Sequence, residues 1–424
     1  VVVTNDIGEE HTDYVELLNR AEVHKAPSMH HQIFLGTGHR EGFMDRDTFC
    51  DLAGSVDPGE VEKRHAGTAI TDTALMFYTS GTTAMPKGCP LNHVVLQHAG
   101  VVGGTDRLRL VEGDVVWNPL PMFHSAFTQP LTGTLHVGGT LVSMAHFEPD
   151  EALDLITRER VTVAFPAFPT ITLQILHHPR YTPETLSGVR VMLNVGPPEE
   201  LVAMQALMPH TTQITCFGMS ECGGSIAMCN PDDPLPLRSE CSGNALPGID
   251  IEVRDPETGE TLAHGEPGEI VARGRGVFSG YYNDPEKTEA AFWEGGWFRT
   301  GDLGVLDVEG RVTFRGRLKD MLKVGGENVA AVEIEGYLAL HPAVKLAQVV
   351  GLPDEKYGEV PVAFVELIPG AAATEAEMID FCLGDIASFK VPRHVRFVED
   401  WPMGATKILK SALRERILAE IATA

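Results

Sequence analysis

Residues Tyr78–Gly88 read YTSGTTAMPKG, and this stretch says more about the chain than any other. Small hydroxyl side chains and one glycine fill positions 79–83, and Lys87 follows directly after a proline. The backbone N–H groups and short hydroxyls of such a loop can approach phosphate oxygens, while the lysine supplies a cation. It is not a Walker A loop, because Lys87 is followed by glycine and not by Ser or Thr. We therefore expect a phosphate-binding loop; the simpler alternative is a surface turn rich in Gly, Ser and Thr.

The residues that surround the loop predict an α/β arrangement. Apolar residues 73–78 predict a buried strand that ends at the loop. Further strands are expected at 115–119, 161–165, 189–193 and 213–217, with helices at 149–158 and 170–177. Strands that alternate with helices favour parallel sheets covered by helices. The first seventy residues are poorly patterned, with a helix-like stretch at 13–20 and loop-like material at 24–46.

The pattern changes twice after residue 242. Short strands at 249–253, 269–273 and 304–308, separated by Pro and Gly, predict a small antiparallel sheet or β-barrel. Beyond Gly316 a helix from 332, strands at 345–350 and 360–367, and helices at 374–383 and 410–422 predict a small α+β domain. We expect an α/β multi-domain protein with parallel-sheet subdomains and a small β-barrel in residues 1–317, followed by a small mobile α+β domain in residues 318–424.

Composition narrows the class of protein and its partners. The 424 residues are 43% hydrophobic and 22% charged, which is typical of a globular protein of two or three domains. The 59 acidic and 33 basic residues give a formal charge of −26, which disfavours nucleic acid and anionic membranes as partners. No apolar run is long enough for a membrane span and no secretory signal is recognised. The seven cysteines form no C-x-x-C pair, so we expect neither a disulfide framework nor a zinc site, and a cytoplasmic location.

Two further motifs place carboxylates beside glycine turns. Residues 216–221 read CFGMSE after an apolar strand, and a carboxylate there can bind Mg²⁺ that is shared with phosphates. Residues 297–303 read WFRTGDL, and a carboxylate after a Thr-Gly turn can accept both hydroxyls of a ribose. Taken alone, Glu221 is more often a solvated glutamate and Asp302 more often a turn residue.

Each of the remaining motifs is weak evidence for a functional site when it is taken alone. Basic turns and lysines at the start of a helix are usually solvated, and a histidine or phenylalanine near a strand end is usually core. These motifs are PMFHS at 121–125, AFPT at 167–170, NVGPP at 194–198, GRLKD at 316–320, KVGGEN at 323–328 and PMGATKILK at 402–410.

Together and in this order, the motifs resemble those of the adenylate-forming (AMP-binding) superfamily, which includes acyl-CoA synthetases, luciferases and the adenylation domains of peptide synthetases. The resemblance runs from about Thr73 to the C-terminus. The chain departs from the usual motifs at several positions: Ala84 for glycine, Phe217 for tyrosine, Ser220 for threonine, Val195 and Pro197 in the adenine segment, and no glycine directly before Lys407.

The resemblance implies a site for ATP, Mg²⁺ and coenzyme A. Glu221 would be the magnesium ligand, Ser220 a contact of the α-phosphate, and Asp302 with Arg317 the contacts of the ribose. Gly196 and Pro197 would contact adenine, and Gly325 with Gly326 would line the tunnel for the pantetheine arm of CoA. The full set of expected cofactor-binding residues is Thr79, Ser80, Gly81, Thr82, Thr83, Lys87, Gly196, Pro197, Phe217, Gly218, Met219, Ser220, Asp302, Arg317, Gly325 and Gly326.

The resemblance also implies the catalytic residues, the acid pocket and a hinge. Lys407, with Lys410 as the alternative, would stabilise the charge that develops at the α-phosphate, and Thr82 and Glu221 complete the catalytic set. Lys319 would be the hinge of the C-terminal domain. The acid pocket is expected to contain His124, Phe168 and Asn194.

The sequence therefore predicts ATP-dependent activation of a carboxylic acid to an acyl-adenylate, with release of pyrophosphate, and transfer of the acyl group to CoA. An adenylate-forming ligase with another acceptor, such as a carrier-protein thiol or an amine, is the alternative within the superfamily. A P-loop kinase or a nucleotide-binding regulator would explain the phosphate loop alone, but not Glu221, Asp302 and Lys407 together. Family members usually have a longer region before this loop, so we expect part of the N-terminal region to be missing. The acid and the oligomeric state stay open.

Overall fold

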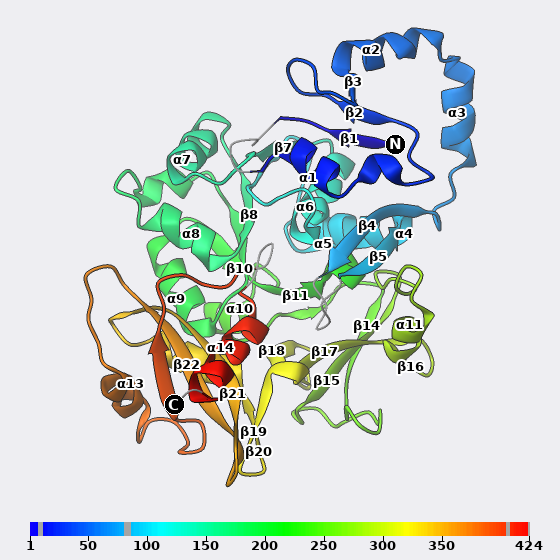
Figure 1. Ribbon diagram of the computed structural model, residues 1–424. Helices are drawn as coiled ribbons and strands as arrows, with labels where there is room; N and C mark the ends of the chain where they lie inside the picture. The colour runs from blue at the N-terminus through cyan, green and yellow to red at the C-terminus, as the bar shows by residue number, and fades with distance from the viewer. Residues whose placement is uncertain (7–11, 80–85, 404–407, 423–424) are drawn as a thin grey trace.

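The computed structural model describes residues 1–6, 12–79, 86–403 and 408–422 (Figure 1). Its N-terminal region forms a small parallel sheet of β1 (Val2–Thr4), β2 (Gln32–Phe34) and β3 (Met44–Asp45). The helices of this region are α1 (Tyr14–Arg20), α2 (Arg46–Asp51) and α3 (Pro58–Gly67), and the first of the short 3-10 segments is η1 (Val23–Lys25). None of α1, α2 and α3 contains a buried residue. The stretch 24–46, predicted as a loop, thus contains the two strands β2 and β3. They are too short to show the alternation of apolar and polar residues by which a strand is recognised in a sequence.

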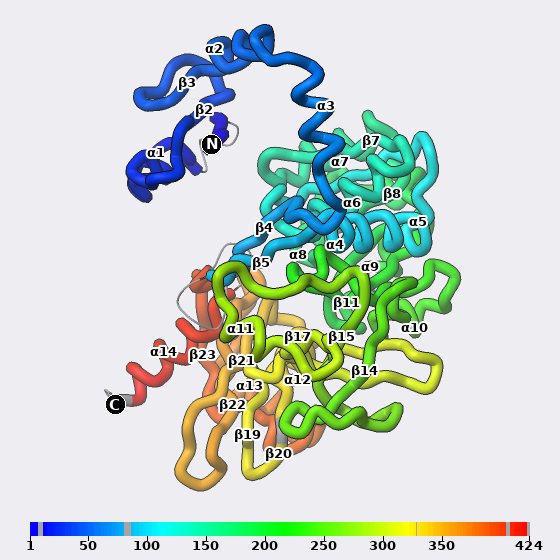
Figure 2. The backbone as a smooth tube through the Cα atoms, turned by 90° about the vertical axis from the view of Figure 1, so that its right-hand side faces the viewer, coloured from blue at the N-terminus to red at the C-terminus, as the bar shows by residue number. Residues whose placement is uncertain are grey.

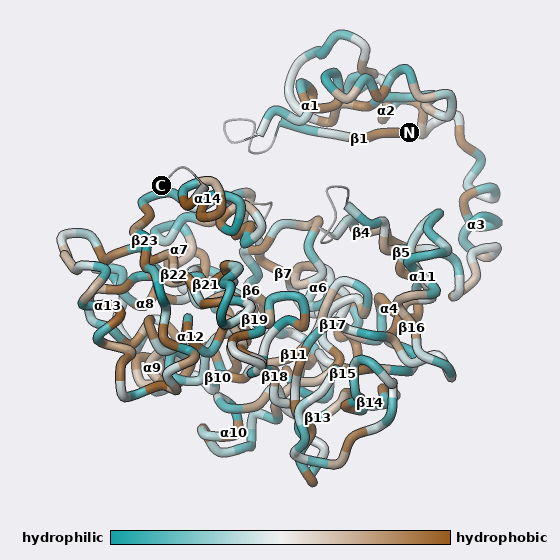
Figure 3. The backbone as a smooth tube through the Cα atoms, turned by 60° about the horizontal axis from the view of Figure 1, so that its bottom comes forward, coloured by the Kyte–Doolittle hydropathy of each residue, from teal (hydrophilic) through white to brown (hydrophobic). Residues whose placement is uncertain are grey.

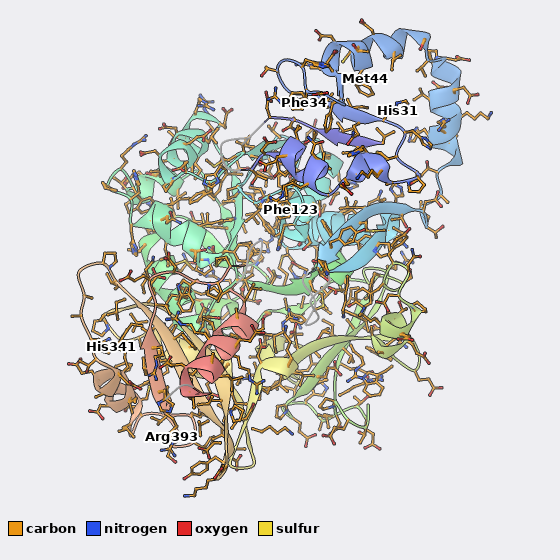
Figure 4. All side chains as sticks on the ribbon, viewed as in Figure 1. His31, Phe34, Met44, Phe123, His341 and Arg393 are labelled. Carbon is orange, nitrogen blue, oxygen red and sulfur yellow. The ribbon has the colours of Figure 1, made fainter. Side chains whose placement is uncertain are left out.

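This region is set apart from the rest of the molecule. Figures 2 and 3 show it at one end, joined to the body of the protein through α3. Its small core includes Ile33, Phe34 and Phe43, which are buried, and the Arg40 guanidinium lies 4.7 Å from the centre of the Phe34 ring. The labelled side chains of His31, Phe34 and Met44 lie together in it in Figure 4.

The phosphate-loop motif lies in a β-hairpin. The strand predicted at 73–78 is β4 (Thr73–Thr79), which pairs in antiparallel fashion with β5 (Lys87–Asn92) so that Thr79 faces Lys87. The next residues form α4 (His93–Gln97), a π-helical turn η3 (His98–Val102) and α5 (Gly103–Asp106). Gly100 in η3 permits a close approach to the helix Ser125–His136 (α6), because a Cβ there would lie 1.7 Å from Thr132 Oγ1.

A five-stranded parallel sheet forms the centre of the N-terminal part, as predicted. Its order is β10-β9-β8-β6-β7. Strand β8 reads VAFPA and is buried throughout, as expected for a strand covered on both faces. The strands are β6 (Val115–Asn118), β7 (Thr140–Ser143), β8 (Val163–Ala167), β9 (Val191–Asn194) and β10 (Thr212–Ile214). The helices are α6 (Ser125–His136), α7 (Pro149–Arg158), α8 (Pro169–Leu176) and α9 (Pro198–Leu207).

Two hydrophobic cores cover the two faces of this sheet. One core joins Trp117 of β6 to residues of α7, α8 and α9, including Ile156, Ile175 and Met204. The other joins Val116 of β6 and Phe165 of β8 to Phe127 of α6. The sheet therefore holds the carboxyl ends of its strands in fixed positions, where ligands of α/β proteins usually bind.

The single strand predicted at 213–217 is wrong, because the chain leaves one sheet and enters another at Thr215. Strand β10 ends at Ile214 in the parallel sheet, whereas β11 (Cys216–Met219) pairs in antiparallel fashion with β12 (Gly224–Met228). A 3-10 turn, η5 (Ser220–Cys222), connects β11 and β12. Strand β12 also pairs with β13 (Asn244–Ala245), and α10 (Leu235–Glu240) lies between them in sequence.

The predicted antiparallel region is present as a five-stranded sheet. Its strands are β14 (Ile249–Arg254), β15 (Gly268–Gly274), β16 (Phe292–Trp293), β17 (Trp297–Leu306) and β18 (Val312–Arg317), and α11 (Pro285–Ala290) precedes β16. The order is β14-β15-β17-β16, and β18 also pairs with β17. Among the described strands, no pairing joins β14 to β16 or β18, so the sheet is open. Of the two predicted forms, it is the small antiparallel sheet and not the β-barrel.

The C-terminal part has a sheet and cores of its own, as predicted. After a short 3-10 turn, η6 (Leu318–Asp320), the sheet has the order β20-β19-β22-β21, and β23 pairs in parallel with β22. Its strands are β19 (Met321–Val324), β20 (Glu327–Ala330), β21 (Val344–Asp354), β22 (Gly358–Leu367) and β23 (His394–Phe397). Its helices are α12 (Ala331–Leu338), α13 (Glu375–Cys382) and α14 (Lys410–Ala422).

Helices α12 and α13 pack on one core of this part, and α14 packs on a second core through Leu413 and Ile417. Within the part of the chain that the structure describes, no helix has the length and apolar character needed to cross a membrane.

Candidate functional site

The first element of the candidate site is the end of the β4–β5 hairpin. Thr79 and Lys87 are half-buried and face each other in the hairpin register. Four of the predicted phosphate-loop residues, Ser80, Gly81, Thr82 and Thr83, lie outside the described residues. The stem of the loop is therefore placed at the end of a hairpin, with the lysine at its second strand.

The Glu221 motif is a tight turn between β11 and β12. Gly218 is needed here, because a Cβ at this position would lie 2.1 Å from the carbonyl oxygen of Gly224. Phe217 is buried and its ring stacks on Phe314 of β18, with ring centroids 6.2 Å apart. Met219 and Ser220 are half-buried. The turn thus presents a half-buried Glu221, and Phe217 of the same motif contacts the strand that carries Arg317.

Tyr281 connects Glu221 with Lys87. The Tyr281 hydroxyl donates a hydrogen bond of 3.0 Å to Glu221 Oε1, and Lys87 Nζ lies 4.6 Å from the centre of the Tyr281 ring. Burial and the nearby Glu221 carboxylate raise the pKa of Tyr281, so its hydroxyl stays a hydrogen-bond donor. The sequence motifs do not include this residue; the only signal for it is an aromatic pair directly after Gly280.

The predicted ribose pair is brought together by strand register. Asp302 on β17 is the direct cross-strand neighbour of Arg317 on β18, and Arg317 Nε lies 2.8 Å from Asp302 Oδ1. The Asp302 side chain is 3% exposed, whereas that of Arg317 is 40% exposed. The Asp302 N–H also donates to Thr300 Oγ1 at 3.1 Å, which holds the Thr-Gly turn. A carboxylate fixed in this way can accept hydrogen bonds from two vicinal hydroxyls.

The predicted adenine segment follows β9. Gly196 and Pro197 are half-buried, and a Cβ at Gly196 would lie 2.7 Å from Pro169 Cγ. Asn194, which the sequence places in the acid pocket, is fully buried and its amide is engaged in hydrogen bonds. Thr172 Oγ1 donates to Asn194 Oδ1 at 2.6 Å, and Asn194 Nδ2 donates to Gln213 Oε1 at 3.1 Å. In this geometry Asn194 fixes the end of β9 rather than offering its amide to a ligand.

The other two predicted pocket residues lie against each other. The rings of His124 and Phe168 meet edge to face, with centroids 6.0 Å apart. His124 caps α6, because its Nδ1 accepts a hydrogen bond of 3.1 Å from the Ala126 N–H. Phe123 beside it, labelled in Figure 4, is exposed. Ala167 has a positive φ of 59°, a conformation that is rare for alanine and is found most often near functional sites.

The predicted hinge and CoA residues lie at the start of the C-terminal part. Lys319 is in the η6 turn that follows Arg317. Gly325 and Gly326 form the β19–β20 turn with φ values of 62° and 92°, which glycine adopts without strain. Figures 1 and 2 show this turn at the far end of the C-terminal part, away from the β4–β5 hairpin. The turn geometry is a reason for both glycines that is independent of CoA.

The two lysines considered for catalysis differ in what the structure describes. Lys407 lies outside the described residues. Lys410 is half-buried, and its Nζ donates to Glu335 Oε1 at 2.5 Å. The same oxygen of Glu335 accepts the Val349 N–H at 2.7 Å. Lys410 thus ties α14 to α12 and β21, which is a structural task and leaves Lys407 as the better match.

Magnesium fits the residues that are present. Among the described residues there is no group of three or more His, Cys, Asp or Glu side chains that could hold a metal ion alone. Mg²⁺ does not need such a group, since it commonly binds through one or two carboxylates and the phosphates of a substrate. Glu221, half-buried and oriented by Tyr281, is a carboxylate of this kind.

Comparison with known proteins shows the family. Residues 9–282 match the model of the AMP-binding enzyme family, and residues 333–407 match that of the AMP-binding enzyme C-terminal domain. YngI of Bacillus subtilis (strain 168), whose name describes an acyl-CoA synthetase, is 35% identical over 91% of this chain and 71% of its own length. 4-Coumarate–CoA ligase 3 of Oryza sativa subsp. japonica is 34% identical over 82% of this chain and 65% of its own length.

Solved structures agree with this result. The anthranilate CoA ligase AuaEII in complex with anthranoyl-AMP has a TM-score of 0.85 at 27% identity, and covers 99% of this chain and 78% of that one. ATP-bound MatB from Rhodopseudomonas palustris has a TM-score of 0.77 at 30% identity, and the match covers 98% of this chain and 88% of the MatB chain. The amide bond synthetase McbA from Marinactinospora thermotolerans has a TM-score of 0.79 at 29% identity, and the match covers 98% of this chain and 79% of the McbA chain.

The chain belongs to the AMP-binding enzyme family, and it resembles the acyl-CoA synthetases of that family. It spans about two thirds of the length of YngI and of 4-coumarate–CoA ligase 3. These matches confirm the predicted family and the predicted α/β multi-domain class with parallel sheets and a C-terminal domain.

Proposed function

We propose that this chain activates a carboxylic acid with ATP and then transfers the acyl group to the thiol of coenzyme A. The observation that carries this proposal is the joining of three motifs that are far apart in sequence. Tyr281 joins Lys87 to Glu221, and the Phe217–Phe314 stack joins the Glu221 motif to β18, where Arg317 pairs with Asp302. Together, these side chains offer partners for the phosphates, for a metal ion and for a ribose.

The first half-reaction is an attack by a carboxylate oxygen on the α-phosphorus of ATP. An O–P bond forms, the bond from the α-phosphorus to the bridging oxygen breaks, and pyrophosphate leaves with that oxygen. Lys87 and the phosphate loop hold the phosphates, while Asp302 holds the ribose hydroxyls. Mg²⁺ on Glu221 would neutralise phosphate charge when it is bound. The main contributions of the protein are positioning and charge stabilisation.

In the second half-reaction the CoA thiol attacks the acyl carbonyl, the thioester forms and AMP leaves. We propose residues 1–317 as the adenylation domain and residues 318–424 as the mobile domain, with Lys319 as the hinge between them. Lys407 would act in the first half-reaction and be withdrawn before the second. Gly325 and Gly326 would then have to move toward the acyl-adenylate, since their turn is distant from the β4–β5 hairpin in this structure.

We also propose a cytoplasmic location. All seven cysteines are free, and five of them are buried. Free thiols of this number are typical of a reducing compartment.

Release of pyrophosphate tests the first half-reaction. The purified chain is incubated with Mg·ATP and a panel of aliphatic and aromatic acids, and pyrophosphate and ADP are both measured. Acid-dependent pyrophosphate without ADP is expected. Formation of ADP, or no pyrophosphate with any acid, would contradict the proposal.

The acceptor is tested separately, because an amide bond synthetase is among the similar structures. With an acid that gives pyrophosphate, CoA should be consumed in equal amount to the AMP released. If an amine is acylated and CoA is ignored, the activation step stands but the acyl-CoA synthetase assignment fails.

A further inference from the structure

We propose that Tyr281 is a positioning residue that orders the phosphate side of the ATP site: its hydroxyl orients Glu221 for Mg²⁺, and its ring holds Lys87 for the ATP phosphates. This inference rests on the function proposed above. It concerns a residue for which the sequence motifs assign no role.

Tyr281 lies in a loop that is fixed at its base. Phe278, which is buried, packs its ring against the rings of Phe292 and Phe298 at centroid distances of 5.8 and 5.2 Å. The Tyr281 ring meets Phe278 edge to face at 4.9 Å. The Tyr281 N–H donates to Thr288 Oγ1 at 2.9 Å. The ring therefore keeps its position without help from a bound ligand.

The glycine before Tyr281 is required by the same loop. Gly280 has a φ of 144°, and a Cβ there would lie 2.4 Å from Thr288 Cγ2. A side chain at this position would push the loop away from Thr288 and move the tyrosine.

The loop contacts both parts of the phosphate side through the backbone. The Phe278 N–H donates to the carbonyl oxygen of Glu221 at 2.9 Å, and the Tyr282 N–H donates to the carbonyl oxygen of Gly88 at 2.9 Å. The first bond fixes the η5 turn, and the second fixes β5 next to Lys87. The backbone of this loop thus holds the two elements at a set separation before any side chain is considered.

The Tyr281 side chain then adds one contact to each functional group. Its hydroxyl donates to Glu221 Oε1 at 3.0 Å, which leaves the carboxylate in one orientation. Its ring lies 4.6 Å from Lys87 Nζ, which is within the range of a cation–π contact. Loss of a group that orients a metal ligand typically lowers metal affinity or activity by about 10- to 100-fold. One residue therefore couples the metal ligand to the lysine.

The hydroxyl and the ring are separable by mutation. Tyr281→Phe removes the hydrogen bond to Glu221 and keeps the ring over Lys87. Tyr281→Leu removes both contacts. Tyr282→Phe is the matched control, because the Tyr282 side chain is exposed and its contact with Gly88 is made by the backbone.

Binding of Mn²⁺ gives a readout that does not depend on turnover. Free Mn²⁺ is measured by electron paramagnetic resonance while it is titrated into the full chain with a non-hydrolysable ATP analogue. Tyr281→Phe should weaken Mn²⁺ binding to the protein–nucleotide complex by about tenfold, as for other lost partners of metal ligands. Tyr282→Phe should bind as the parent does. Equal Mn²⁺ affinity in Tyr281→Phe and the parent would overturn the inference.

A double-mutant cycle separates positioning from a general loss of structure. In a Glu221→Gln background the additional Tyr281→Phe change should alter Mn²⁺ affinity by less than about twofold, since the oriented carboxylate is already gone. A tenfold loss in both backgrounds would mean that Tyr281 acts through the fold, and the inference would fail.

Steady-state kinetics test the Lys87 contact. Tyr281→Phe should raise the Mg²⁺ concentration for half-maximal pyrophosphate release and leave the ATP requirement at saturating Mg²⁺ unchanged. Tyr281→Leu should in addition raise the KM for ATP by about threefold, which is the effect expected for the loss of one exposed cation–π contact. If Leu and Phe behave alike, the ring does not position Lys87. A parent that releases no pyrophosphate would instead overturn the proposed function.

Discussion

The two halves of the candidate ATP site are held together by different means. In the ribose half, Asp302 and Arg317 are cross-strand neighbours, and the backbone pairing of β17 with β18 places them. In the phosphate half, Lys87 and Glu221 lie on separate elements that the backbone of a third segment, the Tyr281 loop, holds together. Their two functional groups meet through one side chain, that of Tyr281. A pair that is set by strand register tolerates changes elsewhere. A pair that is set by one side chain depends on that side chain.

Lys407 is expected to act at the reacting α-phosphate, and its loss should have the largest effect. Lys407→Ala should slow adenylation at least about 100-fold, because a preorganised charge at the reacting phosphate is lost. It should still convert a supplied acyl-adenylate and CoA to the thioester. Stopped-flow measurement of each half-reaction checks this. Equal loss in both half-reactions would rule out a role confined to adenylation.

Asp302→Ala removes the predicted ribose contact from the ribose half of the site. The carboxylate that accepts hydrogen bonds from the two ribose hydroxyls would be lost, so ATP and a stable acyl-adenylate analogue should both bind about 50-fold more weakly. The ribose hydroxyls provide the matched control: the parent should prefer ATP over 2′,3′-dideoxy-ATP, whereas the variant should bind the two alike. A variant that keeps the preference of the parent would show that Asp302 does not bind the ribose.

Glu221→Gln tests the phosphate half of the site, and its effect on activity should differ from that of Asp302→Ala. Removal of the negative charge should raise the Mg²⁺ requirement by about 30-fold, as expected when a charged metal ligand becomes neutral. Activity should partly recover at high Mg²⁺, which Asp302→Ala should not show. Titration of Mg²⁺ at saturating ATP compares the two variants. Identical Mg²⁺ dependence in parent and variant would remove Glu221 from the metal site.

The same contrast explains what can be predicted from the sequence. Asp302 and Arg317 each lie in a recognisable motif, and the resemblance assigns both to the ribose. The sequence predicts a strand next to them only at 304–308, so the register of β17 with β18 that pairs them is found in the structure alone. Tyr281 is 60 residues from Glu221 and has no periodic pattern around it, so nothing local indicates their contact. The break at Thr215 gives no signal, because an apolar run from 213 to 217 continues through a change of sheet. Strands of two or three residues near the N-terminus give no period to detect.

The smallest effect is expected where one side chain joins elements away from the substrates. Lys410 bonds to Glu335, which also accepts the Val349 N–H, so this pair links α14 to α12 and β21. Lys410→Met keeps the apolar stem but leaves Glu335 without its cation. The Lys410 side chain is 22% exposed and that of Glu335 is 12% exposed, so the free energy of unfolding of the C-terminal part should fall by only about 1–2 kcal/mol.

Adenylation by Lys410→Met should stay within about twofold of the parent, since the change removes a structural contact and no charge at the reacting phosphate. Chemical denaturation measures the stability, and pyrophosphate release measures adenylation. A Glu335→Gln variant should lose a similar amount of stability, because it breaks the same pair from the other side. If Lys410→Met instead lost adenylation and kept its stability, Lys410 would be the catalytic lysine, and the roles of Lys407 and Lys410 would be reversed.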